Sequence, residues 1–215
     1  MTTVFLIRHG LTEHTGVWLY GRTPGVHLSE RGLAQAERLA TRFRGVRLTA
    51  IRSSPLERCM ETAAPLAAAQ RLTPTAADDL IEMDAGAWTG RTLASLARTK
   101  LWRGIQRTPS QVAFPDGESF VAANARFVRA LADVAASYPK GRVALVTHSD
   151  TIRMLLAHTS GAHLDEFQRM IVDTSSVSVV AVGESPPRLV LANDTEGSLA
   201  RFGPARARRG AAAGT

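Results

Sequence analysis

The sequence has a single cysteine, no long apolar run and no basic leader segment. Because Cys59 stands alone, the 215-residue chain has neither an internal disulfide nor a cysteine-rich zinc site. No apolar run approaches the roughly 20 residues that a membrane-spanning helix needs. No basic segment precedes the apolar residues Val4–Ile7, and Arg8 and His9 follow them at once, which is typical of a buried strand and not of a signal peptide. We therefore expect a cytoplasmic protein that does not bind a membrane.

Lysine is also scarce, and the basic charge comes almost wholly from arginine. The chain has a formal net charge of +7, and its only lysines are Lys100 and Lys140. More than half of that net charge lies in residues 201–215, where four arginines stand mostly among glycine, alanine and proline. Such a segment has too little apolar content to pack. We expect residues 201–215 to form a disordered, solvated tail, and we expect no nucleic-acid partner.

Length and apolar patterning predict an α/β fold in one domain over residues 1–200. The stretch from about 90 to 117 is less regular and is expected to form a small lid-like insertion. Continuous apolar character predicts a buried strand at Val4–Ile7, and further strands are expected at Thr49–Ser53, Arg142–Thr147, Val177–Val182 and Arg188–Ala192. Helical patterns separate these runs. We therefore expect a three-layer α/β/α sandwich with a mostly parallel central sheet.

Four helices have start or stop signals in the sequence. Ser29 is expected to cap a helix whose apolar stripe contains Leu33, Ala36, Leu39, Ala40 and Phe43. Ser54–Glu57 has the form of a capping box with proline at the first helical position, and Pro65 should kink or end the helix that follows. A longer helix is expected from about Glu118 to Ser137. A fourth, Thr151–His158, would be capped by Ser149 or Asp150 and closed by Gly161.

Two histidines directly follow predicted strands, where ligands bind in sheets of this kind. His9 follows Val4–Ile7, and His148 follows Arg142–Thr147. Beside His9, the planar guanidinium of Arg8 suits bidentate phosphate binding, and its charge favours the neutral, nucleophilic form of the imidazole. By itself, the short string Arg8–Gly10 fits a surface turn equally well.

Arg58 and Glu82 are further candidates for the same site. Arg58 lies in the first turn of a predicted helix, whose N-terminus favours anions. Glu82 lies among Ile81, Met83 and Trp88, where an apolar setting would raise its carboxyl pKa and suit it to general-acid work. A water-exposed loop carboxylate is the alternative for Glu82, and an exposed helical arginine is the alternative for Arg58.

Five motif blocks in order resemble the histidine phosphatase family, also called phosphoglycerate-mutase-like, over residues 4 to about 182. The blocks are Leu6–Gly10; Leu28–Gly32 with Gln35 and Ala36; Ser54–Arg58 with Glu61–Ala63; Glu82 with Gly86, Trp88 and Gly90; and Thr147 with His148. Phe114–Ser119 also resembles a loop that family members carry before a long helix. The resemblance implies a phosphoglycerate mutase-like fold and a metal-independent phosphatase that acts on a small phosphorylated metabolite without a cofactor.

The resemblance also implies a role for each matching residue. His9 would accept the phosphoryl group, and Glu82 would protonate the leaving oxygen. Arg8, Arg58 and His148 would bind the phosphoryl oxygens. Additional phosphate contacts are expected from Thr12, Thr15 and the backbone at Gly21 and Ser149.

The sequence departs from the family pattern at three positions. Leu11 stands where an acidic residue is frequent, His27 replaces a frequent proline, and Ser149 follows His148 where glycine or alanine is common. These departures leave the phosphate ester open.

Three alternatives remain at this point. A phosphoglycerate mutase would carry basic and aromatic residues just after the acid, whereas Met83–Ala85 follows Glu82 here. A metallohydrolase is disfavoured because the other histidines show no recognised ligand spacing. A non-catalytic phospho-ligand binding protein would not need all five candidate residues. The oligomeric state is open, with a homodimer as one option.

Overall fold

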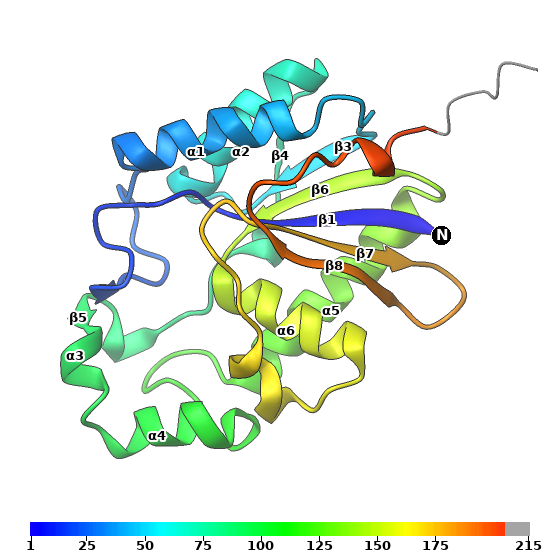
Figure 1. The fold of residues 1–215 in the computed structure, drawn as a ribbon. Helices are drawn as coiled ribbons and strands as arrows, with labels where there is room; N and C mark the ends of the chain where they lie inside the picture. The colour runs from blue at the N-terminus through cyan, green and yellow to red at the C-terminus, as the bar shows by residue number, and fades with distance from the viewer. Residues whose placement is uncertain (205–215) are drawn as a thin grey trace, which may run out of the picture.

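A computed structural model of the chain describes residues 1–204 (Figure 1). Its strands are β1 (Thr2–Arg8), β2 (Trp18–Leu19), β3 (Ala50–Ser53), β4 (Thr75–Ala76), β5 (Arg91–Thr92), β6 (Arg142–Thr147), β7 (Val177–Val182) and β8 (Arg188–Asp194). Its α-helices are α1 (Glu30–Arg42), α2 (Glu57–Gln70), α3 (Leu93–Leu96), α4 (Lys100–Arg107), α5 (Phe120–Ser137) and α6 (Ser149–Ser160). Short 3-10 helices lie at Asp78–Leu80, Gly86–Trp88, Pro109–Gln111, Leu164–Arg169 and Ala200–Phe202.

The central sheet has six strands in the order β4-β3-β6-β1-β7-β8. Strands β4, β3, β6 and β1 run parallel, whereas β7 is antiparallel to β1 and β8 is antiparallel to β7. Strands β2 and β5 form a separate two-stranded ribbon. The expected mostly parallel sheet is confirmed, and all five predicted strands are present in it.

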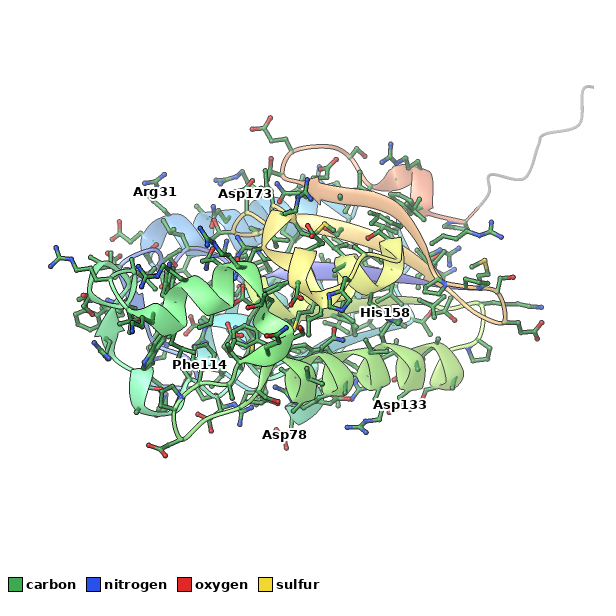
Figure 2. All side chains as sticks on the ribbon, turned by 90° about the horizontal axis from the view of Figure 1, so that it is seen from below. Arg31, Asp78, Phe114, Asp133, His158 and Asp173 are labelled. Atoms are coloured by element: carbon green, nitrogen blue, oxygen red, sulfur yellow. The ribbon has the colours of Figure 1, made fainter. Side chains whose placement is uncertain are left out.

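Helices cover both faces of this sheet (Figure 1). Phe5 and Ile7 of β1 belong to a core with α1 and α2, whereas Val4 and Leu6 belong to a core with α5 and α6. Alternate side chains of one strand thus face opposite layers, as the pleat of a strand requires. Figure 2 shows the second layer, with Asp133 marking α5 and His158 marking α6. The predicted three-layer α/β/α sandwich is confirmed.

Helix α1 is capped by Ser29 as expected, but its first turn buries Gly32 and not the predicted Leu33. The Ser29 side chain accepts a hydrogen bond from Gly32 N at 3.2 Å. Leu33 was expected in the apolar stripe, but its side chain is 48% exposed, so that prediction is wrong. Gly32 faces inward instead, because a β-carbon there would lie only 2.0 Å from Leu11 O. The glycine lets the helix approach that loop backbone closely.

The predicted capping box before α2 is also wrong. The helix begins at Glu57, Leu56 occupies the N-cap position, and no side-chain cap bond is present. The Ser54 hydroxyl lies 2.8 Å from His148 Nε2 and 3.5 Å from the backbone N of Leu56, so its shorter contact is with the site at the sheet edge. Pro65 lies inside α2, which continues to Gln70, so the proline does not end the helix.

Helix α6 is longer than predicted at both ends. It spans Ser149–Ser160, and its N-cap position is His148, without a side-chain cap bond from either predicted residue. Its C-terminal signal was correct, because Gly161 adopts a left-handed conformation with φ of 75°. The start of the helix at Ser149 places its N-terminus directly beside His148.

The stretch from 90 to 117 is more regular than the sequence indicated. It contains β5, α3, α4 and the 3-10 helix Pro109–Gln111, and it lies to one side of the sheet (Figure 1). The side chains of Thr92 and Thr99 cap α3 and α4. Leu96 and Ile105 are buried and join the core that contains Trp88. That this stretch acts as a lid stays a prediction.

The disordered tail predicted from residue 201 is wrong for its first residues. Ala200–Phe202 forms a 3-10 helix, and the Phe202 ring packs edge-on against Phe5 with ring centroids 5.7 Å apart. The rest of the predicted tail, residues 205–215, lies outside the described residues. Within residues 1–204, no helix is both long enough and apolar enough to cross a membrane.

Candidate active site

His9 and His148 lie side by side at the carboxyl edge of the sheet. Strands β1 and β6 pair in parallel with Arg8 opposite Thr147, so the next residue of each strand reaches the same edge. His9 N donates to Thr147 O at 3.0 Å, which continues the ladder for one more residue. The two imidazole rings have centroids 5.4 Å apart, and both side chains are buried.

One hydrogen bond fixes the tautomer of His9. Its Nδ1 donates to Gly10 O at 2.8 Å, and because a carbonyl oxygen only accepts, the proton must be on Nδ1. The lone pair is therefore on Nε2. Burial chiefly, and then the charges of Arg58 and Arg8, lower the pKa of His9 well below 6.5. His9 is thus a neutral imidazole with Nε2 free to act as a nucleophile.

Gly10 lets this turn pass close to α1. A β-carbon at Gly10 would lie 2.8 Å from Gly32 O, so any other residue would push the turn away. Gly10 N donates to Thr62 Oγ1 at 2.9 Å, and Thr62 is one turn beyond Arg58 in α2. The turn that orients His9 is therefore tied to the helix that presents Arg58.

Arg58, which is fully buried, and Arg8, which is half-buried, bring two guanidinium groups near His9. Arg58 Nη2 donates to Gly21 O at 2.8 Å, while its Nε and Nη1 are buried without a hydrogen-bond partner. Arg8 Nη1 donates to Val172 O at 2.7 Å, and its Nε is likewise buried and unpartnered. The Tyr20 ring lies 4.7 Å from the Arg58 guanidinium and covers it. Buried donors without partners are costly, so these groups are poised to bind an anion.

His148 is held from two sides. Its Nε2 lies 2.8 Å from Ser54 Oγ, and its Nδ1 lies 3.4 Å from Arg58 Nη2 and 3.7 Å from Glu82 Oε2. Burial, followed by the charge of Arg58, lowers the pKa of His148 well below 6.5. His148 is therefore a neutral hydrogen-bonding group between the arginine and the carboxyl.

Glu82 faces this cluster from the loop after the 3-10 helix Asp78–Leu80. Burial first, and the negative charge of Asp150 second, raise its carboxyl pKa to about 7 against the opposing effect of the Met83 N–H and of Arg58. Its Oε1 accepts from Met83 N at 2.9 Å. The predicted apolar setting is present, and the carboxyl can carry a proton near neutral pH.

The structure brings His9, Glu82, Arg8, Arg58 and His148 into one cluster, from segments up to 140 residues apart in the sequence. Of the secondary candidates, Thr12 Oγ1 and Thr15 Oγ1 lie 2.9 Å apart and bond each other. Gly21 supplies its carbonyl to Arg58, and Ser149 begins α6. Phosphate contact by these four stays a prediction.

Several contributors were not recognised as site residues in the sequence. Ser54 was assigned to a helix cap, and Asp150, which raises the pKa of Glu82, was considered only as a cap. The sequence alone assigned neither residue a role in the site, because each acts on a residue distant in the chain. Cys59 Sγ lies 3.6 Å from His148 Nε2, but burial raises the thiol pKa to about 12, so the thiol is not a reactive thiolate near neutral pH.

The described part of the chain holds no group of three or more His, Cys, Asp or Glu side chains arranged for a metal ion. The charged groups that face His9 are Arg8 and Arg58. The arrangement therefore presents a neutral imidazole, fixed positive charge and a carboxyl with a raised pKa, which are groups that phosphoryl transfer can use.

The sequence matches the histidine phosphatase superfamily, branch 1, over residues 4–195. It is 31% identical over 186 residues to phosphoserine phosphatase 1 of Hydrogenobacter thermophilus, covering 86% of this chain and 88% of the relative. It is 31% identical over 189 residues to a probable phosphoglycerate mutase of Proteus mirabilis, covering 86% and 87%. A solved mycobacterial glucosyl-3-phosphoglycerate phosphatase is 26% identical, with a TM-score of 0.80 and coverage of 89% and 98%. These matches confirm the resemblance, the expected fold and the phosphomonoester hydrolase class.

Proposed function

Because this chain belongs to the histidine phosphatase superfamily, we propose that it hydrolyses small phosphate monoesters, without a metal ion, through a phosphohistidine at His9. The observation that carries the proposal is the hydrogen bond from His9 Nδ1 to Gly10 O, which leaves Nε2 unprotonated beside the guanidinium groups of Arg58 and Arg8. A nucleophile and a fixed positive charge for the phosphoryl oxygens are thus preformed.

In the first step, His9 Nε2 attacks phosphorus and a nitrogen–phosphorus bond forms. The bond between phosphorus and the ester oxygen breaks, and that oxygen takes the proton of Glu82 and leaves as an alcohol. Arg8, Arg58 and His148 bind the equatorial oxygens, where charge is concentrated in the transition state. The raised pKa of Glu82, about 7, supports its role as the proton donor.

In the second step, water attacks the phosphohistidine. The Glu82 carboxylate left by the first step accepts the proton of the attacking water, the nitrogen–phosphorus bond breaks, and inorganic phosphate departs. His9 returns to the neutral state that its lowered pKa favours, and Glu82 is protonated again. Atoms and charges balance over the two steps with water as the only co-reactant.

The substrate class is a small phosphorylated metabolite. The names of the relatives suggest which esters to try: phosphoserine and glucosyl-3-phosphoglycerate are substrates of the two named phosphatases. The candidate contacts described above recognise only the phosphoryl group, so they do not choose between these esters.

A phosphomutase is the second candidate, and the relative from Proteus mirabilis, a probable phosphoglycerate mutase, is what favours it. Against it, the residues after Glu82 are not basic or aromatic, and Met83 and Ala85 are buried in the core. They offer no cation to a substrate carboxylate. A mutase would also have to retain a bisphosphorylated intermediate while water was excluded.

The test is phosphate release from a panel of esters in excess chelator, by wild type beside His9→Ala. The panel includes phosphoserine, glucosyl-3-phosphoglycerate, 3-phosphoglycerate and p-nitrophenyl phosphate. We expect turnover by wild type that is abolished in His9→Ala. When the wild-type reaction with a ³²P-labelled ester is quenched, we also expect an acid-labile ³²P label on His9. His158→Ala is the matched control, because His158 is an exposed histidine on α6.

Different failures would point to different alternatives. Loss of activity on chelation would overturn the metal-free route. Interconversion of phosphoglycerates that outpaces phosphate release would favour the mutase. Ester binding without any turnover would favour a non-catalytic role and overturn the proposal.

A further inference from the structure

Glu82 is the only member of the candidate cluster that neither belongs to nor adjoins a regular strand or α-helix. It lies between two 3-10 helices, Asp78–Leu80 and Gly86–Trp88. Within residues 1–204, its carboxyl accepts one hydrogen bond, from the adjacent Met83 N, and otherwise lies 3.7 Å from His148 Nδ1. The position of this carboxyl must therefore depend on how the loop backbone is fixed.

Two arginines from distant segments bind the backbone of this loop. Arg22, from the loop between β2 and α1, donates from Nε to the carbonyl oxygen of Glu82 itself at 2.7 Å. Arg126, from α5, donates from Nη1 to Ile81 O at 2.9 Å and to Asp79 O at 3.1 Å. The carbonyls of the two peptide units that flank the Glu82 α-carbon are thus held by guanidinium groups.

Glu118 joins the two arginines. Its Oε2 accepts from Arg22 Nη2 at 3.1 Å and from Arg126 Nη2 at 2.7 Å, and its Oε1 accepts from Arg126 Nε at 3.1 Å. Its backbone N–H donates to Asp84 O at 2.9 Å. The Glu118 and Arg126 side chains are only 16% and 19% exposed, so solvent screens this pair less than a surface salt bridge. We call Arg22, Glu118 and Arg126 the acid clamp.

The acid clamp also reaches the phosphate-binding side of the site. Gly21, which precedes Arg22, accepts from Arg58 Nη2 through its carbonyl at 2.8 Å. Two consecutive residues therefore touch the two halves of the site: Gly21 holds Arg58, and Arg22 holds the backbone of Glu82. The spacing between the phosphate and the proton donor is set across this short stretch.

We propose that Arg22, Glu118 and Arg126 are positioning residues that hold the Glu82 carboxyl at the leaving oxygen of the substrate. They do not touch the phosphoryl group and act through the loop backbone. The inference rests on the proposed role of Glu82 as the proton donor. Without the acid clamp, the loop relaxes, and the carboxyl no longer meets the leaving oxygen while the phosphate remains bound.

Two esters with different leaving groups separate positioning from a general loss of structure. An alkyl phosphate needs a proton on its leaving oxygen, whereas p-nitrophenolate departs as a stable anion and needs almost none. The quantity to compare is kcat/KM, because it reports the steps up to release of the alcohol and not the later hydrolysis of phosphohistidine. The alkyl ester is the one that wild type hydrolyses best in the panel above.

The variants are Glu118→Gln and Arg126→Met, with Arg126→Lys as the conservative replacement. Arg142→Met is the matched control, because Arg142 Nε also donates to a backbone carbonyl, Phe202 O at 2.9 Å, but Arg142 opens β6 at the other end of the sheet. Glu82→Gln serves as the reference, because it shows how kcat/KM for the two esters changes when the proton donor itself is lost. Circular dichroism and thermal unfolding of each variant establish that it is folded.

We expect Glu118→Gln and Arg126→Met to lower kcat/KM for the alkyl ester by about 100-fold and for p-nitrophenyl phosphate by less than about threefold. We expect the same pattern for Glu82→Gln. KM for p-nitrophenyl phosphate should stay near the wild-type value, and Arg126→Lys should recover part of the alkyl activity. Arg142→Met should leave the ratio between the two esters unchanged.

Suppose that Glu82→Gln lowers kcat/KM for the alkyl ester much more than for p-nitrophenyl phosphate. The inference is then overturned if the acid-clamp variants lower kcat/KM equally for both esters, or for neither. If Glu82→Gln lowers kcat/KM equally for both esters, Glu82 is not the proton donor of the proposed function. The positioning role of the acid clamp is then also wrong. The two failures are therefore distinguishable in one set of measurements.

Discussion

The two halves of the candidate site are held in place by different means. His9 and His148 extend two neighbouring strands, and Arg58 lies in the first turn of a helix, so backbone hydrogen bonds and the core fix all three. Glu82 lies on a loop and is fixed by side chains, the acid clamp, that come from two other segments. The strand-end half is thus positioned by the backbone of the fold, whereas the loop half, with Glu82, is positioned by a few charged side-chain contacts.

This difference predicts how each half responds to substitution. A residue in the strand-end half can lose its chemistry while the scaffold stays intact, because the scaffold does not depend on its side chain. A change in the loop half should disturb geometry and chemistry together, because the contacts that fix the loop are themselves polar and partly exposed. Three measurements would sharpen or break this comparison.

The largest effect is expected from Arg58→Met in the strand-end half. Removing a positive charge from the phosphoryl oxygens should lower kcat/KM by about 10³-fold, and equally for alkyl and p-nitrophenyl esters, since both carry the same phosphoryl group. Stability should hold, because a buried guanidinium with two unpartnered donors costs desolvation free energy that methionine does not. Urea unfolding should show a loss of no more than about 1 kcal/mol, or a gain. A loss of several kcal/mol would mean that Arg58 is part of the scaffold after all.

A smaller effect, but one on both activity and stability, is expected from Gly86→Ala in the loop half. Gly86 has φ of +50°, and a β-carbon there would lie 2.1 Å from Pro115 O, on the loop that carries Glu118. We expect a stability loss of at least about 2 kcal/mol and a loss of alkyl-ester activity of at least about tenfold.

Gly161→Ala is the matched control for this prediction. Gly161 also has positive φ, +75°, but nothing lies within 4 Å of the added β-carbon. It should cost about 1 kcal/mol from backbone strain alone and leave the ratio between the two esters unchanged. If Gly86→Ala and Gly161→Ala change that ratio equally, the position of Glu82 does not depend on the close packing of Gly86 against the loop that carries Glu118.

The smallest effect is the pH dependence. Glu82 donates its proton only while protonated, and its pKa is raised to about 7, so alkyl-ester kcat/KM should fall about tenfold per pH unit above pH 7. His9 acts only while neutral, and its pKa lies well below 6.5, so the acid limb should lie below that value. The ratio of wild type to Glu82→Gln on the same ester cancels ionisation of the substrate. A ratio that stays constant through pH 7 would show that Glu82 does not titrate as the donor.

Much of the strand-end half was readable in the sequence. The runs Val4–Ile7 and Val143–Val146 lie in buried strands because they are continuously apolar. The rule that ligands bind beyond the ends of such strands then points to His9 and His148. The Ser29 cap and the Gly161 stop were read correctly, because each is a contact within a few residues of the chain. Local signals sufficed where the physical cause was local.

The errors have the opposite character. Leu33 fits the helical period but is exposed, because Gly32 is needed against the backbone of Leu11. Ser54 fits a capping box, but its hydroxyl lies against His148, almost a hundred residues later. In both cases a contact distant in the sequence overrode a valid local pattern.

The sequence by itself determined the layers of the sheet, the edge where the two histidines meet and the identity of the candidate nucleophile. Only the tertiary structure decided which nitrogen of His9 is free, that the pKa of Glu82 is raised, and that Arg22, Glu118 and Arg126 hold its loop. The physical reason is range: apolar periodicity and capping act between neighbours in the chain, whereas burial and charge depend on what folding brings together from all of it.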